Sequence, residues 1–166
     1  MPDLLLLRHA KSDWSDSSLR DVERPLNARG REAARAMGHH LARLPPIDAI
    51  WASPAIRVRQ TLEGIRAVHE GLPDEEVMAF IYGASSERIV SALRDARADR
   101  LLLVGHNPTM HDLTIRLTRG QSGAMRDTVM AKYPTGALAV LNIEGDWSDL
   151  RDGAATLAGF TRPADL

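Results

Sequence analysis

The chain has 166 residues, of which 44% are hydrophobic and 26% are charged, and its formal net charge is −1. This composition is typical of one globular domain spanning residues 1–166, and it argues against a disordered chain or a general nucleic-acid binder. The absence of cysteine excludes disulfides, thiolate metal sites and cysteine nucleophiles. No apolar stretch reaches the roughly 20 residues that span a bilayer, and no secretion signal is evident, so we expect a cytoplasmic protein without membrane partners.

An apolar run opens the chain and ends in two basic residues. Leu4 to Leu7 is predicted to be a strand buried on both faces, because strands of a parallel sheet covered by helices are continuously apolar. Arg8 and His9 follow where this strand ends, at the edge of an open α/β sheet where ligands bind. The arginine offers a cation to an anionic group, and the imidazole offers a nucleophile or a base.

The segment after this strand is predicted to be a loop, followed by a helix and a second strand. Residues 11–25 show no clear periodicity and are interpreted as an active-site loop. Asn27 can cap a helix that runs to about Leu44, where two prolines end it. A strand is then expected at about 48–52.

A second helix is expected to begin directly after that strand. Ser53 suits the N-cap and Pro54 suits the first helical position, and the helix is predicted to reach about His69. Arg57 then lies about one turn into the helix, in the anion-attracting field of its N-terminus. Gln60 and Thr61 lie on the same side by their three- and four-residue spacing.

The second half of the chain repeats the alternation of strands and helices and then changes to strands alone. The expected elements are a strand at 76–80, a helix at 87–97, a strand at 100–104, a helix at 108–118, an irregular segment at 119–134, and two strands at 136–143 and 156–161. The last two strands have no helix between them, so we expect them to pair in an antiparallel manner at one edge. This order predicts a three-layer α/β/α fold with a mostly parallel central sheet and helices on both faces.

A second histidine is predicted at the same sheet edge as His9. The strand at 100–104 is followed by Gly105-His106-Asn107-Pro108, just as the first strand is followed by Arg8 and His9. Each histidine alone is compatible with a structural role. Two separate strands that deliver a histidine to one edge indicate a shared site.

Three segments resemble the signature of a known family. They are Arg8-His9-Ala10, the stretch Ser53-Pro54-x-x-Arg57-x-x-Gln60-Thr61, and Gly105-His106-Asn107. Together they are similar to the histidine phosphatase superfamily, which includes the cofactor-dependent phosphoglycerate mutases. Residues 8–14 and 24–30 resemble its SixA-type branch, the phosphohistidine phosphatases, and the likeness extends to 81–85 and 160–163. The resemblance implies a phosphoglycerate mutase-like fold.

The resemblance also implies roles for particular residues. His9 matches the nucleophile that receives the phosphoryl group, while Arg8, Arg57 and His106 match the residues that bind the phosphate oxygens. Ser15 stands six residues after the histidine, where mutase-like members commonly have a phosphate-contacting asparagine, and it is included as a substrate-binding residue. No metal and no cofactor are implied.

The leaving group decides between substrate classes. Mutase-like members carry a glutamate acid after the third strand, whereas residues 80–85 contain no carboxylate here. Alcohol phosphates then lack a proton donor, while the imidazole of a phosphohistidine can be protonated by solvent. We therefore expect a metal-independent phosphatase acting on phosphohistidine in a phosphocarrier or histidine-phosphotransfer protein, in an open, shallow pocket.

Two other functions remain compatible with the sequence. One is a phosphatase of small phosphate esters that uses Asp13 or Glu87 as the acid. The other is a phosphohistidine-binding module without turnover. The sequence does not indicate an oligomeric state.

Overall fold

The computed structural model describes residues 1–166 and contains a single six-stranded sheet with the order β3-β2-β4-β1-β5-β6. The strands are β1 (Asp3–Arg8), β2 (Ala49–Ala52), β3 (Glu75–Val77), β4 (Arg100–Gly105), β5 (Leu138–Ile143) and β6 (Ala155–Thr161). Strands β3, β2, β4 and β1 are parallel, whereas β5 runs antiparallel to both β1 and β6. The expected parallel sheet with an antiparallel edge is therefore confirmed.

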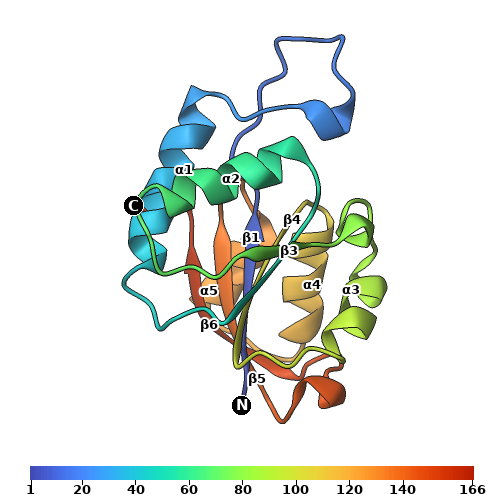
Figure 1. Ribbon diagram of the computed structural model, residues 1–166. Helices are drawn as coiled ribbons and strands as arrows, with labels where there is room; N and C mark the ends of the chain where they lie inside the picture. The colour runs from blue at the N-terminus through green and yellow to red at the C-terminus, as the bar shows by residue number, and fades with distance from the viewer.

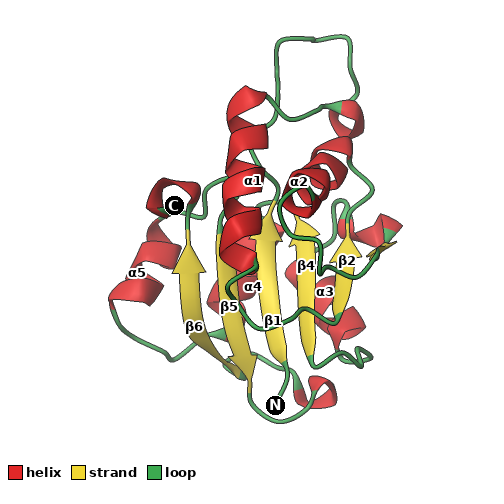
Figure 2. Ribbon diagram, turned by 60° about the vertical axis from the view of Figure 1, so that its left-hand side comes forward, coloured by secondary structure: helices red, strands yellow, loops and turns green.

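Helices cover both faces of this sheet (Figures 1 and 2). They are α1 (Ala28–Leu41), α2 (Ile56–Arg66), α3 (Ser86–Leu93), α4 (Thr109–Leu117) and α5 (Ala124–Ala131). Helices α1 and α2 pack on one face, and α3, α4 and α5 pack on the other. The three-layer α/β/α architecture is confirmed. No helix combines the length and the apolar character needed to cross a bilayer.

The central strand β1 shows why its apolar run is continuous. Leu4 and Leu6 pack against the layer that contains α3 and α4, while Leu5 and Leu7 pack against α1 and α2. All four side chains are fully buried. Successive side chains of a strand point to opposite faces, so a strand covered on both sides has no polar position.

Helix α5 lies within residues 119–134, which were predicted to be irregular, and this prediction was wrong. The helix begins directly after Gly123, whose φ of 124° is a conformation that favours glycine. Val129 is its only buried residue. A short helix with one buried side chain has no apolar stripe, so its sequence carries no helical periodicity.

The strand expected at 76–80 is also shorter than predicted. Strand β3 pairs only through residues 75–77 at the edge of the sheet. A short 3-10 turn (η2, Ala79–Ile81) follows it. This turn brings Tyr82 towards the carboxyl edge of the sheet, where it becomes part of the site described below.

The segment between β1 and α1 projects from the carboxyl edge of the sheet (Figure 1). Its base is held by a bridge between Ser12 and Leu26, and it contains a 3-10 turn (η1, Asp21–Glu23). Helix α1 approaches this base so closely that a Cβ on Gly30 would lie 2.1 Å from the carbonyl oxygen of Lys11. A glycine is therefore required where the helix meets the end of β1.

Candidate active site

The carboxyl ends of two neighbouring strands bring the two predicted histidines together. Arg8, the last residue of β1, is in register with Gly105, the last residue of β4. The backbone N–H of His9 donates to the carbonyl oxygen of Gly105 at 3.1 Å. The rings of His9 and His106 consequently lie with their centroids 5.3 Å apart.

A cavity of about 380 Å³ at this edge contains all four predicted catalytic side chains. It is lined by Arg8, His9, Lys11, Ser12, Trp14, Arg57, His106, Asn107 and Thr135. Three of these side chains are cationic and the cavity has one hydrophobic lining residue, which suits an anionic group. We refer to it as the phosphate pocket.

The buried side chain of His9 has one unprotonated ring nitrogen. Its Nδ1 lies 2.7 Å from the carbonyl oxygen of Ala10, which can only accept, so Nδ1 carries the proton. Its Nε2 lies 3.3 Å from Nε of Arg57, which can only donate, so Nε2 keeps its lone pair. Burial, together with the charges of Arg57 and Arg8, lowers the pKa of His9 to about 4. His9 is therefore neutral near pH 7, with Nε2 available for attack.

Arg57 stands between the two histidines, in the first turn of α2. Besides its contact with His9, it places Nη2 3.3 Å from Nδ1 of His106. A phosphoryl group approaching Nε2 of His9 would meet this guanidinium. Thr61, one turn further along the helix, donates to the carbonyl of Arg57 at 2.7 Å and accepts from the N–H of Ala10 at 3.0 Å. Arg57 and Thr61 thus lie on the same side of α2, as predicted, and the hydroxyl of Thr61 links this side of the helix to the end of β1.

His106 is held by a residue for which the sequence indicated another role. Because Nδ1 accepts from Arg57, the proton resides on Nε2, which donates to Oγ of Ser53 at 2.7 Å. Ser53 was predicted to be the N-cap of α2, and this prediction was wrong. The helix begins at Ile56, with Ala55 at the N-cap. Burial and the neighbouring His9 and Arg57 lower the pKa of His106 to about 3. To donate to a phosphate oxygen through Nδ1, His106 must take up a proton there, which an adjacent dianion favours.

Arg8 supplies a second cation, which is partly buried. Its Nη1 donates to the carbonyl of Tyr133 at 3.0 Å, the same oxygen that Asn107 contacts at 2.9 Å. Its Nε is buried and has no protein acceptor. Arg8 also lines the phosphate pocket, so its charge acts on an anion bound there. Burial and the charge of Arg57 lower the pKa of Arg8.

Other predicted residues lie outside the pocket. Ser15 is exposed, and its backbone N–H donates to Oδ1 of Asp13 at 2.8 Å, so neither residue lines the cavity. Glu87 is on the surface and forms an ion pair with Arg116. The structure thus brings together Arg8, His9, Arg57 and His106 but leaves out Ser15 and both candidate acids. No three His, Asp or Glu side chains are grouped so as to hold a metal ion.

One carboxylate that no sequence pattern indicated does reach the site. Asp21, in η1, accepts from Nη2 of Arg57 at 3.0 Å and from the hydroxyl of Tyr82 at 2.5 Å, and its carbonyl accepts from Nη1 of Arg57 at 2.7 Å. These contacts with Tyr82 and Arg57 lower the pKa of Asp21. Asp21 is therefore ionised, and its carboxylate positions the guanidinium of Arg57. Asp21 and Tyr82 come from a loop and a short turn without periodicity, so no sequence pattern places them here.

The depressed pKa values lead to a testable titration. We expect the Cε1–H resonances of His9 and His106, assigned by their loss in His9→Gln and His106→Gln, to stay unshifted from about pH 8 down to about pH 5. A histidine of ordinary pKa, about 6.5, would show most of its shift in this range. A midpoint near 6.5 for either resonance would contradict the buried neutral pair. Since the unfolded chain binds more protons between about pH 4 and about pH 6.5, these residues lower stability as the pH falls through that range.

The chain is similar in sequence to known proteins. Residues 4–80 match the family model of the histidine phosphatase superfamily (branch 1). An uncharacterized protein of Mycobacterium tuberculosis (strain H37Rv) is 38% identical over 163 residues, which cover 95% of this chain and 99% of the relative.

Two solved structures are similar over nearly the whole chain. A candidate phosphohistidine phosphatase SixA from Nakamurella multipartitia superposes with a TM-score of 0.85 at 30% identity, covering 98% of this chain and 96% of the other. A candidate phosphohistidine phosphatase SixA from Agrobacterium tumefaciens gives a TM-score of 0.80 at 30% identity, covering 98% and 99%.

Proposed function

The chain belongs to the histidine phosphatase superfamily, and from this premise we propose that it hydrolyses phosphohistidine on a protein through a phosphorylated intermediate at His9. The substrate would be a phosphocarrier or histidine-phosphotransfer protein. The description of the two similar structures as candidate phosphohistidine phosphatases supports this choice. The geometry around the leaving group supports it independently.

The observation that carries the proposal is a nucleophile with cations around it but no carboxylic acid beside it. Nε2 of His9 is unprotonated, and Arg57 and Arg8 line the same cavity, where they would bind the phosphoryl oxygens. Asp13 and Glu87 lie elsewhere. Asp21 reaches Arg57 but is held ionised, so it has no proton to give to a leaving group.

These properties fit a phosphoramidate better than an ester. An alkoxide leaving group needs a proton from the enzyme, whereas the imidazole of phosphohistidine can take a proton from solvent before the P–N bond breaks. The absence of a carboxylic acid beside His9 therefore favours phosphoramidate substrates over phosphate esters. The ester-phosphatase alternative would need a carboxylic acid that neither Asp13, Glu87 nor Asp21 provides.

The reaction would proceed in two displacements. Nε2 of His9 attacks phosphorus, the P–N bond of the substrate breaks, and the substrate imidazole leaves in neutral form with a proton from solvent. Water then attacks the phosphoryl group on His9, which releases inorganic phosphate and restores the neutral His9. Arg57 and Arg8 bind the equatorial oxygens in both steps, where the transition-state charge is spread.

A substrate panel in excess chelator tests the proposal. We expect a phosphohistidine protein and free phosphoramidate to be hydrolysed with a kcat/KM at least about 100-fold above those for sugar phosphates and nucleotides, equivalent to about 2.7 kcal/mol of leaving-group discrimination. Omitting the chelator should leave the rates unchanged. A larger kcat/KM for the esters would overturn the proposal in favour of a small-ester phosphatase.

A further inference from the structure

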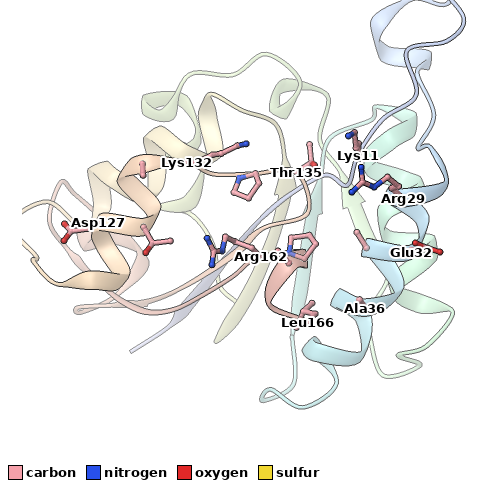
Figure 3. A pocket seen from close by; sticks show the side chains of 15 residues that line it. Lys11, Arg29, Glu32, Ala36, Asp127, Lys132, Thr135, Arg162 and Leu166 are labelled. Atoms are coloured by element: carbon pink, nitrogen blue, oxygen red, sulfur yellow. The ribbon is translucent and has the colours of Figure 1, made fainter.

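A second, larger cavity adjoins the phosphate pocket. It has a volume of about 1020 Å³ and lies between α1, α5 and the C-terminal 3-10 turn η4 (Pro163–Asp165) (Figure 3). Lys11 and Thr135 line both cavities. A ligand whose phosphoryl group lies beside His9 can therefore continue directly into this space, which we call the α1–α5 groove.

Basic side chains gather at the end of the groove that meets the phosphate pocket. Lys11, Arg29 and Lys132 are exposed, and none of them takes part in an ion pair of the chain. Figure 3 shows them on the two sides of Thr135, Lys132 coming from the end of α5 and the other two from the β1–α1 side. This end of the groove thus carries positive charge that no carboxylate of the chain neutralises.

The remaining charged groups of the groove lie farther from the phosphate pocket or are already paired. Arg162, in the middle of the groove, binds Asp165 with Nη2 2.9 Å from Oδ1. Glu32 and Asp127 lie at the two outer flanks (Figure 3). The groove is therefore basic next to the phosphate pocket and acidic at its flanks.

We propose that the α1–α5 groove binds the acidic residues that directly flank the phosphohistidine of the substrate protein. The inference rests on the proposed function, because it takes the phosphoryl group at His9 as the anchor. The phosphate pocket has room for the phosphoryl group, and the adjoining groove accommodates a stretch of polypeptide. Unpaired cations beside the anchor favour carboxylates adjacent to the phosphohistidine, whereas carboxylates placed farther away would meet Glu32 or Asp127.

Two peptides of identical composition and charge test this arrangement. Each carries one phosphohistidine; in the first, glutamates flank it directly and serines occupy the ends, and in the second these positions are exchanged. For the unmodified protein we expect kcat/KM to be about fivefold higher for the first peptide at low salt, as two exposed charge pairs would give. The difference should shrink as the salt concentration is raised.

Charge reversal in the groove should remove this preference. We expect the double variant Arg29→Glu/Lys132→Glu to hydrolyse both peptides at similar rates or to favour the second. The matched control is Arg97→Glu. Arg97 is exposed, forms no ion pair and lies just before β4, at the amino end of that strand, whereas the phosphate pocket lies at its carboxyl end. It should keep the full preference of the unmodified protein.

The outcomes separate the groove from the chemistry. Equal rates for the two peptides with the unmodified protein would contradict the proposed role of the groove, as would a preference that survives in the double variant. Neither result would contradict the proposed phosphatase activity. If neither peptide is hydrolysed, the proposed function fails, and fluorescence anisotropy of the labelled, unphosphorylated first peptide decides about the groove. We then expect at least about threefold weaker binding to the double variant than to Arg97→Glu, and equal affinities would overturn it.

Discussion

Replacing His9 with alanine is expected to abolish both phosphate release and phosphoryl labelling of the protein. The unprotonated Nε2 is the atom that would form the new bond to phosphorus. Removing the nucleophile of a covalent mechanism typically costs several orders of magnitude in kcat. The measurement is release of inorganic phosphate from phosphoramidate, combined with mass spectrometry of protein quenched shortly after substrate addition.

The chemistry of the label identifies the intermediate. Unmodified protein should carry a phosphate on His9 that is stable to base and labile to acid, as phosphohistidine is, and His9→Ala should carry none. His9→Gln, which fills more of the same space, should behave like the alanine variant if folding is not the cause. His39→Ala, at an exposed histidine of α1, is the matched control and should keep both label and turnover.

Two results would redirect the interpretation. Full activity in His9→Ala would show that the nucleophile lies elsewhere. Tight binding of phosphate by the unmodified protein, without label or turnover, would favour a phosphohistidine-binding module. The second result would leave the roles of Arg8 and Arg57 as phosphate ligands intact, since a binding module uses the same cations.

The sequence predicted the parts of the site that lie at the ends of regular elements. Leu4–Leu7 and residues 101–104 are continuously apolar because both faces of their strands are buried, and this pattern placed Arg8, His9 and His106 at one edge. Arg57 could be placed because the spacing of α2 sets which side chains share a face. Both inferences depend on repeating local geometry.

The parts that the sequence did not reveal depend on tertiary contacts of irregular segments. Asp21 lies in the projecting loop and Tyr82 in a single turn, and their meeting over Arg57 has no counterpart in any periodic pattern. The residue type of Ser53 suits an N-cap, but α2 begins only at Ile56, and the Ser53 hydroxyl instead accepts from the N–H of Ala55 and binds His106. Ser15 was placed by counting from His9 across this loop, where sequence spacing does not determine position.

Replacing Arg57 with alanine is expected to lower kcat/KM for phosphohistidine and phosphoramidate by at least about 100-fold, equivalent to about 2.7 kcal/mol of transition-state stabilisation. Its guanidinium contacts both histidines, and Asp21 and Tyr82 hold it in place, so its donors are already aimed at the charge that develops on the phosphoryl oxygens. The matched control is Arg59→Ala, two residues along α2, where an exposed arginine forms only an ion pair with Glu63.

Asp21→Asn separates the two contributions that Arg57 makes. If Arg57 acts on the phosphoryl group, Asp21→Asn should lower kcat/KM less than Arg57→Ala does. The reason is that the carbonyl of residue 21 still accepts from Nη1 of Arg57 at 2.7 Å and keeps the guanidinium in place. If Arg57 served chiefly to hold the loop, Asp21→Asn and Arg57→Ala would lower kcat/KM to a similar extent. If kcat/KM of Arg57→Ala stays within a few-fold of that of the unmodified protein, and Arg59→Ala is equally active, then Arg8 and His106 bind the phosphoryl oxygens without Arg57.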